Sequence, residues 1–217
     1  MALLSEKDRN NLIAEFEKLE SPVRLIVFTQ EFECQYCTQT REIAEELAEL
    51  SEQISVEVYD FVVHKEIAEE YGIDKIPATI IMRGGDQPQD YGIRIYGIPA
   101  GYEFSSLVED VMMVSRNDSG LSAETRAWIS SLKTRLHLQV FVTPTCPHCP
   151  RAVNMAHQLA FESEFIQADM IEATEFPQLS VKYQVMGVPR TVINETEHLE
   201  GAAPEQMMLS KLKTIVG

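Results

Sequence analysis

The chain contains the same cysteine and proline pattern twice, and this repeat strongly limits what it can fold into. The motif CQYC occupies positions 34–37 and the motif CPHC occupies positions 146–149. Pro77 and Pro189 follow the two motifs at the same distance, each after a β-branched aliphatic residue and each before x-Thr. All four cysteines of the chain lie in these motifs. The repeat indicates two similar units, each with its own pair of thiols and its own proline segment.

The length of the chain fits this duplication. A chain of 217 residues can form two units of about 110 residues each, a common domain size. The segment 115–122 is polar, contains one glycine and has no aliphatic period, so it is the best linker candidate. We therefore expect one unit over residues 1–116 and a second over residues 117–217, both of the α/β class.

Both halves have the same expected order of elements, based on hydrophobic periodicity and turn residues. The order is helix, strand, helix at the cysteine pair, strand, short helix, proline segment, hairpin and final helix. In the first half the expected helices cover 12–19, 34–50, 68–71 and 103–114, and the expected strands cover 24–29, 55–60, 79–82 and 94–96. In the second half the expected helices cover 123–133, 146 onward, 175–183 and 204–216, with strands at 138–142 and 165–169 and a hairpin at 191–199.

Composition excludes several functional classes. The net charge is −16 and no cluster of Lys or Arg is present, which argues against binding to nucleic acid or to anionic membranes. No apolar run is long enough to span a bilayer, and the N-terminus becomes polar after four residues. We therefore expect a cytoplasmic protein. In a reducing compartment, close cysteine pairs indicate metal binding or redox activity more than static cross-links.

The cysteine spacing suits dithiol chemistry. Two residues between cysteines at the start of a helix bring both sulfurs within bonding distance, and the helix N-terminus favours the thiolate. We expect Cys34 and Cys146 to attack a disulfide, and Cys37 and Cys149 to resolve the mixed disulfide.

Two other uses of the cysteines remain open. Two CxxC pairs can form a four-thiolate zinc site, but such pairs are usually separated by about 15–20 residues, whereas a whole unit separates these two. A static disulfide within each pair would close so small a ring that it would add little stability. We therefore expect no metal site.

Each proline segment is expected to contain a cis peptide bond facing the cysteines. A single proline at this place would be an ordinary strand-start proline, but two at identical distances from two cysteine pairs favour cis bonds at Ile76–Pro77 and Val188–Pro189. The backbone of Ile76 and Val188 would then be free to bind an extended substrate strand.

The residues inside and beside the two motifs indicate that the sites differ. Gln35 and Tyr36 add no positive charge to the first motif, which follows acidic residues, whereas Pro147 and His148 lie in the second and Arg151 follows it. Positive charge near a sulfur favours its thiolate. We expect Cys146 to have the lower pKa and its pair to be the more oxidising couple.

These motifs resemble the thioredoxin fold, with its strand–CxxC–helix and its cis-proline loop. Two fused units, CQYC followed by CPHC, and the segment YGIPAGYEF at 96–104 closely resemble the glutaredoxin-like protein disulfide oxidoreductases of thermophilic archaea and bacteria. The resemblance implies a tandem duplication of the thioredoxin fold, each unit being a mixed β-sheet flanked by helices. Thioredoxin itself has a buried Asp six residues before its first cysteine. Phe28 and Val140 occupy those positions here, so that proton acceptor is absent.

The resemblance also implies a function and partners. It implies thiol–disulfide exchange on protein substrates through redox-active Cys34–Cys37 and Cys146–Cys149 disulfides, with no bound cofactor. The expected electron donor is a flavoenzyme resembling thioredoxin reductase, since the chain lacks a nucleotide-binding fingerprint. Two alternatives remain: an electron-relay module for a peroxidase, which typically keeps one cysteine pair, and a non-catalytic chaperone that uses the proline-loop groove.

Overall fold

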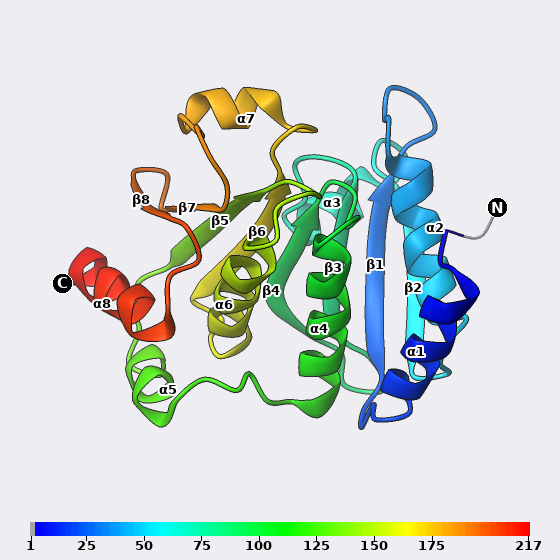
Figure 1. The fold of residues 1–217 in the computed structure, drawn as a ribbon, viewed down its shortest axis with the longest axis horizontal. Coiled ribbons are helices and arrows are strands. Elements are labelled where there is room, and N and C mark those ends of the chain that lie inside the picture. Colours follow the sequence, from blue (N-terminus) through cyan, green and yellow to red (C-terminus); the bar gives the residue numbers. More distant parts are fainter. Residues whose placement is uncertain (1–2) are drawn as a thin grey trace.

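The computed structural model describes residues 3–217 and contains one mixed β-sheet with helices on both faces (Figure 1). The helices are α1 Glu6–Phe16, α2 Cys37–Ala48, α3 Lys65–Glu70, α4 Glu103–Arg116, α5 Ala123–Ile129, α6 Cys149–Phe161, α7 Pro177–Lys182 and α8 Glu205–Val216. The strands are β1 Val23–Thr29, β2 Ile54–Asp60, β3 Ala78–Arg83, β4 Gln89–Tyr96, β5 Leu136–Val142, β6 Ile166–Glu172, β7 Arg190–Ile193 and β8 Glu197–Glu200. The repeated order of elements predicted from the sequence is confirmed.

The two halves share a single sheet. Its strand order is β2-β1-β3-β4-β6-β5-β7-β8, so each half supplies four neighbouring strands in the same arrangement. The halves join where β4 runs parallel to β6, with Ile93 opposite Ala168 and Tyr96 opposite Ile171. The sequence predicted two units but not this pairing, which joins β4, the outermost strand of the first unit on this side, to β6, the outermost strand of the second.

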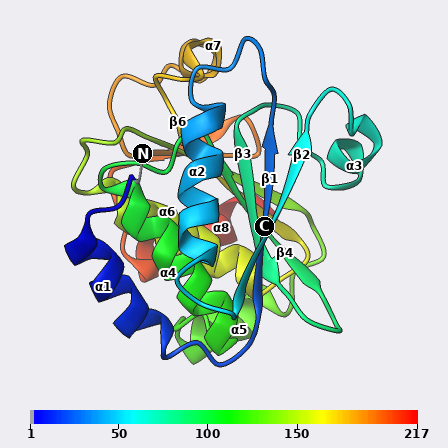
Figure 2. The same cartoon turned by 90° about the vertical axis from the view of Figure 1, so that its right-hand side faces the viewer.

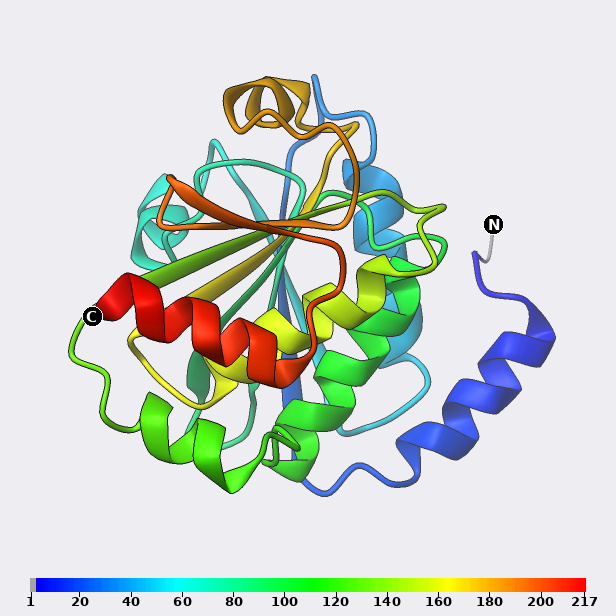
Figure 3. The ribbon, with the colours of Figure 1, turned by 60° about the vertical axis from the view of Figure 1, so that its left-hand side comes forward.

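The sheet carries most of its helices on one face. Residues of α1, α2, α4, α6 and α8 pack with one set of strand side chains, including Val27 and Val140, in the larger core cluster. The opposite strand side chains, including Phe28 and Phe141, pack with the regions of α3 and α7. Figure 2 shows α3 on the far side of the sheet from α2 and α4, and Figure 3 shows α8, α6 and α4 covering the same face. In residues 3–217, no helix has the length and apolar character that crossing a membrane requires.

Strand directions bring both cysteine motifs to one edge of the sheet. β1 runs parallel to β2, β3 is antiparallel to both β1 and β4, and β4, β6 and β5 are mutually parallel. The carboxyl ends of β1 and β5, which lead to the two cysteine pairs, therefore lie at the same edge. Both proline segments, which precede the antiparallel strands β3 and β7, also lie there.

Some element bounds differ from the sequence prediction. The two cysteine helices begin at Cys37 and Cys149, the second cysteine of each pair, because the residues before them form bends in the first motif and turns in the second. In the second motif, the Cys146 amide donates to Thr143 O and the Cys149 amide donates to Cys146 O. The hairpin of the first half is longer than that of the second, mainly because its strands are longer. Strands β3 and β4 have six and eight residues, whereas β7 and β8 have four each.

The segment predicted as a linker is partly structural. Helix α4 extends through Arg116, and Ser115 is buried. The Ser115 hydroxyl donates to Ser21 O and accepts from the amides of Glu20 and Ser21. Leu121 is also buried in the main core cluster. The connection between the halves is therefore fixed to the first unit and continues into the core.

Candidate redox-active site

The first cysteine pair lies between the end of β1 and the start of α2. Cys34 and Cys37 form a disulfide, with Cys34 half-buried and Cys37 buried. The Gln30 amide donates to Cys37 Sγ at 3.4 Å. Buried Cys37 beneath more accessible Cys34 is the arrangement expected for an attacking and a resolving cysteine.

The second pair has the same arrangement but is more enclosed. Cys146 and Cys149 form a disulfide, and their exposed fractions are 8% and 0%. Among the described residues 3–217, no group of three or more Cys, His, Asp or Glu side chains gathers as a metal site would require.

Both predicted cis bonds are present, at Ile76–Pro77 and Val188–Pro189. Ala78 pairs with Phe28 near the end of β1, and Arg190 pairs with Phe141 near the end of β5. Each proline, one residue earlier, therefore lies beside the strand end that leads to a cysteine pair. Pro77 and Pro189 are buried, whereas Ile76 and Val188 are half-buried, and their role in binding substrate stays a prediction.

The residues predicted to tune the cysteines lie mainly at the surface. Gln35 is exposed and donates through Nε2 to the Tyr36 hydroxyl at 3.1 Å. Pro147 and His148 are exposed, and His148 stands at the N-cap of α6 without a side-chain capping bond. Solvent weakens the electrostatic effect of exposed charges. The tuning role of these four residues stays a prediction.

Several exposed apolar side chains lie at the end of the sheet where β1 and β5 lead to the two cysteine pairs, which is called the cysteine edge below. Each belongs to a segment that follows a parallel strand or precedes β7. They are Phe32, Val62, Val63, Tyr102 and Met186, with Met186 93% exposed. They lie in segments spread along the sheet from β2 to β7, and exposed apolar side chains at the same end of the strands as the cysteines are candidates for contact with another chain.

A segment of the first unit, Gly97–Tyr102, connects the two sites. Its Gly97 amide donates to Pro77 O, and its Tyr102 amide donates to Pro144 O, two residues before Cys146. Gly101 has φ +62°, and a Cβ added there would overlap the Pro144 carbonyl. This close approach requires glycine. The segment therefore packs directly against Pro144, which precedes the second pair.

The same segment meets two carboxylates of the second unit. The Ile98 amide donates to Glu175 Oε1 at 2.7 Å. Burial and the nearby Glu172 carboxylate raise the pKa of Glu175 to about 7, against a lowering contribution from the Ile98 amide. Glu172 is itself buried at the end of β6 and accepts from the Glu175 amide. The contact between the two halves therefore contains two carboxyl groups, those of Glu172 and Glu175, close to the end of the sheet that holds the cysteines.

Glu103 is a candidate functional residue that the sequence reasoning missed. It lies in the first turn of α4, directly after Tyr102, and is 1% exposed. Burial raises its pKa to about 7, although the Ser106 hydroxyl, which donates to Oε2 at 2.8 Å, lowers it. Its Oε1 is buried and has no hydrogen-bond partner within residues 3–217.

The position of Glu103 relates it to the second pair. Helices α4 and α6 pack side by side and both begin at the cysteine edge, where the Tyr102 amide bonds Pro144. Glu103 opens α4 and Cys149 opens α6. Phe28 and Val140, at the positions of the missing acid, are fully buried apolar residues. The alternation of polar Glu103, Ser106 and Asp110 with the apolar stripe of α4 was the available sequence signal, but it does not identify the partner helix.

Comparison with known proteins places the chain in a family. A family model described as thioredoxin domain matches residues 24–86 and 136–214, one segment in each half. The chain belongs to the thioredoxin domain family. The tandem thioredoxin fold expected from the sequence is therefore confirmed.

Solved structures of this family include near matches to the whole chain. A protein disulfide oxidoreductase from Aeropyrum pernix superposes with a TM-score of 0.91, is 30% identical, and is matched over 98% of this chain and 93% of its own. The N-terminal N/C domain of alkylhydroperoxide reductase AhpF from Enterococcus faecalis has a TM-score of 0.88 and 26% identity, with coverages of 96% and 99%. The resemblance to the protein disulfide oxidoreductases is confirmed.

Curated relatives are longer proteins. The AhpF-type alkyl hydroperoxide reductase protein of Staphylococcus aureus is 26% identical over 174 residues, which is 80% of this chain and 31% of the relative. The thioredoxin-family chain thus spans about a third of the length of such relatives. Taken with the two disulfides, these findings identify a thiol–disulfide oxidoreductase in general terms.

Proposed function

We propose that this thioredoxin-family chain is a protein disulfide oxidoreductase that exchanges electrons with protein substrates through two CxxC sites. The observation that carries the proposal is that two disulfides, each beside its own cis-proline segment, lie at one edge of a shared sheet. The exposed apolar side chains along that edge support an unfolded or extended protein segment as the substrate.

The exchange follows from the cysteine positions. The Cys146 thiolate attacks a substrate disulfide, forming a mixed disulfide and releasing one substrate sulfur as a thiolate that takes up a proton. The Cys149 thiolate then attacks Cys146 Sγ, which releases the second substrate thiolate and closes the Cys146–Cys149 disulfide. Two electrons pass to the substrate. The reverse sequence oxidises a substrate dithiol, and Cys34 with Cys37 performs the same steps.

Deprotonation of the buried cysteine needs an acceptor within the protein. Cys149 is fully buried, and burial in apolar surroundings raises the pKa of a thiol. We assign Glu103 as the acceptor of its proton, since this carboxyl opens the helix beside α6 and titrates near pH 7. The corresponding helix of the second unit, α8, also opens with a glutamate, but Glu205 accepts hydrogen bonds from Ser122 and Thr125.

The two sites are therefore unequal in this proposal. The second pair has a buried proton acceptor and neutral or positive neighbours in Thr145, His148 and Arg151, whereas the first pair follows Glu31 and Glu33. We propose that Cys146–Cys149 is the more oxidising couple. A division into units 1–116 and 117–217, one site in each, and a cytoplasmic location belong to the same proposal.

A graded glutathione series tests the proposal. The protein is equilibrated, quenched with acid and alkylated, and the thiols of each pair are counted by mass. Two separate two-electron transitions are expected, with the second pair at the higher potential. Double variants Cys34→Ser/Cys37→Ser and Cys146→Ser/Cys149→Ser should each keep part of the reduction of a disulfide-bonded protein such as insulin. A variant with all four cysteines replaced should lose this reduction; if it still prevents aggregation of an unfolded protein as well as the unaltered chain does, the chaperone alternative is favoured instead.

A second candidate is an electron relay to a peroxidase. The match to the AhpF-type alkyl hydroperoxide reductase protein favours it, because such relatives contain this unit as about a third of their length. Two intact cysteine pairs fit broad exchange better. Both candidates need an electron donor, and we propose a thioredoxin-reductase-like flavoenzyme. A relay would transfer electrons from that donor to a peroxidase far faster than to insulin, whereas comparable rates would exclude a dedicated relay.

A further inference from the structure

Gly97 lies between the first proline segment and the second unit. Its amide donates to Pro77 O at 2.9 Å. From the second unit, two side chains approach so closely that a Cβ added to Gly97 would lie 2.6 Å from Glu172 Cβ and 2.8 Å from Glu175 Oε1. The second unit therefore leaves no room for a side chain at a residue that is hydrogen-bonded to the cis-proline of the first site.

The matching glycine of the second unit has different surroundings. The Gly201 amide donates to Pro189 O at 2.8 Å, so both glycines make the same hydrogen bond to the proline of their own unit. A Cβ added to Gly201 would meet no atom of the described chain within 4 Å, apart from its own neighbours in sequence. The two proline segments therefore share their local structure, but only the one in the first unit is supported by residues of the other half.

Glu175 holds the residue that follows Gly97. Its Oε1 accepts a hydrogen bond from the Ile98 amide at 2.7 Å. Glu175 is itself fixed, because its amide donates to Glu172 Oε2 at 2.7 Å and the Thr174 hydroxyl donates to the same oxygen. Glu172 is 1% exposed and ends β6. A buried residue at the end of a strand thus directs the Glu175 carboxyl to the backbone beside Gly97.

We propose that Glu175 is a positioning residue for the first cysteine pair, because it fixes the segment Gly97–Tyr102 against Pro77 in the shape that receives a protein substrate. The inference rests on the proposed function, in which the backbone of Ile76 binds an extended substrate segment. It implies that a side chain of the second unit completes the substrate-binding surface of the first.

The expected effect is on substrate binding. Glu175 is connected to the first site through Ile98, Gly97 and Pro77, which adjoin the backbone of Ile76. A surface that is already ordered loses less conformational freedom when a substrate binds, so its affinity is higher. Loss of one hydrogen bond that maintains this order should weaken binding by about fivefold.

The other end of the segment is held by separate contacts. The Tyr102 amide donates to Pro144 O at 3.0 Å, and Gly101 approaches the same carbonyl closely. These backbone contacts lie three and four residues beyond Ile98. Removing the Glu175 carboxyl should therefore loosen the end of the segment at the first pair and leave the end at the second pair in place.

The test compares Glu175→Met with Glu175→Gln. Met keeps the length of the side chain but cannot accept the Ile98 amide, whereas Gln keeps an acceptor oxygen. Each variant is made in the Cys146→Ser/Cys149→Ser background, where the first pair acts alone, and in the Cys34→Ser/Cys37→Ser background, where the second does. Reduced protein is mixed with excess insulin, and oxidation of the remaining pair is followed by acid quench, alkylation and mass.

The concentration dependence separates binding from chemistry. At the first pair, Glu175→Met should raise the half-saturating insulin concentration about fivefold and change the maximal rate less than twofold, and Glu175→Gln should stay near the unaltered value. The rate with glutathione disulfide, which needs no extended binding surface, should not change. At the second pair, both variants should behave as the unaltered chain does.

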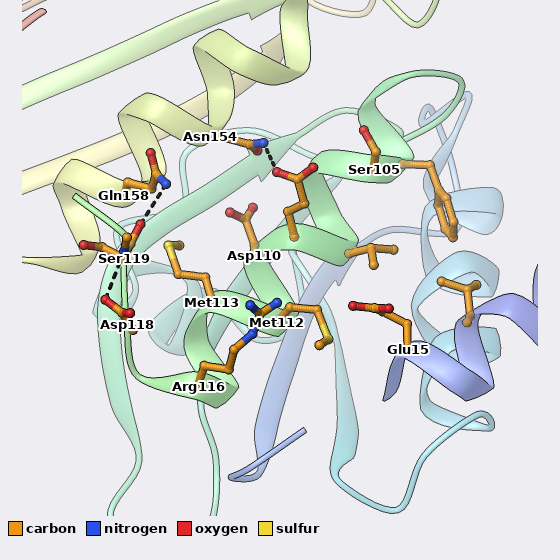
Figure 4. Close-up of a pocket in the computed structure, with 15 residues that line it drawn as sticks. Glu15, Ser105, Asp110, Met112, Met113, Arg116, Asp118, Ser119, Asn154 and Gln158 are labelled. Atoms are coloured by element: carbon orange, nitrogen blue, oxygen red, sulfur yellow. Dashed lines mark hydrogen bonds between the residues drawn. The ribbon is translucent and has the colours of Figure 1, made fainter. Parts of the chain in front are cut away.

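A contact remote from the cysteine edge provides a control. Gln158 of α6 donates through Nε2 to Ser119 O at 2.7 Å and so links α6 to the segment between the halves. Both residues line a pocket of about 640 Å³, shown in Figure 4, whose lining includes no residue of Gly97–Tyr102. Gln158→Met also removes a hydrogen bond from a side chain to the backbone. It should leave the half-saturating concentration unchanged at both pairs.

The possible results separate the inference from the proposed function. An unchanged half-saturating concentration in Glu175→Met, an equal rise at both pairs, or an equal rise in Glu175→Gln or Gln158→Met would refute the positioning role. If neither pair of the unaltered protein reduces insulin, the proposed function itself fails.

Hydrogen exchange tests the central contact without any variant. The Ile98 amide of the unaltered protein should exchange at least tenfold more slowly than an unbonded amide, because the Glu175 carboxyl accepts it. Exchange at the rate of an unbonded amide would refute the inference even if Glu175→Met does not fold.

Discussion

Replacing Glu103 with Gln should change how stability depends on pH. Burial raises the pKa of Glu103 from 4.5 to about 7 in the folded chain. A group whose pKa is raised on folding stabilises the protein fully below its unfolded pKa, and this contribution is lost as the pH rises through the folded value. A difference of one in pKa between the folded and unfolded states corresponds to about 1.36 kcal/mol, so ionisation of Glu103 removes about 3 kcal/mol by pH 9. Gln cannot ionise, so the variant avoids this loss.

The assay is urea unfolding with both pairs oxidised, so that no thiol titrates. The free energy of unfolding of Glu103→Gln relative to the unaltered protein should increase by about 3 kcal/mol between pH 4 and pH 9. Glu205→Gln is a matched control, because Glu205 opens the equivalent helix α8 but hydrogen bonds from Ser122 and Thr125 lower its pKa. That control should lose stability at neutral pH and show no gain at pH 9. Parallel pH curves for Glu103→Gln and the unaltered protein would refute the assignment of Glu103 as a near-neutral acceptor.

Three further predictions address the cysteine edge. His148→Ala should raise the pKa of Cys146, seen as an alkaline shift in the pH profile of its reaction with iodoacetamide, and an unchanged profile would remove His148 from the tuning group. Gly101→Ala should destabilise the chain by about 1–3 kcal/mol more than Gly72→Ala, because both glycines have positive φ but only Gly101 approaches Pro144; equal losses in urea unfolding would contradict the close contact. Met186→Ser should slow reduction of a protein disulfide but leave the reaction with glutathione disulfide unchanged, because Met186 is exposed beside the second proline segment, and equal slowing would place the effect in the chemistry itself.

The local features of this fold could be predicted from the sequence because short-range physics determines them. The CxxC spacing, the doubled proline segments and the strand periodicity specified the order of elements and both cis bonds. Helix starts were less predictable. The turns that hold Cys34 and Cys146 ahead of α2 and α6 depend on hydrogen bonds such as Cys146 N to Thr143 O, which hydrophobic periodicity does not report.

Contacts between the halves could not be predicted in the same way. The parallel pairing of β4 with β6 joins residues such as Tyr96 and Ile171, which are far apart in the sequence. Asp110 and His157 look like an ordinary acidic residue and an ordinary histidine until α4 packs on α6. Their burial at this interface turns two unremarkable polar residues into a hydrogen-bonded pair.

Duplication in this chain produces two sites with different surroundings. In the first unit the Tyr102 amide donates to Pro144 O, two residues before Cys146, and Glu103 follows Tyr102 at the start of α4. The equivalent helix start in the second unit, Glu205, faces Ser122 and Thr125 instead. The sheet is open, with β2 and β8 as its outermost strands, so no third unit lies beside the second one. The second unit therefore has no neighbour to which it could supply the same contact. We therefore propose that two similar motifs placed in a single open sheet acquire different proton chemistry, which would hold the two dithiols of one chain at different potentials.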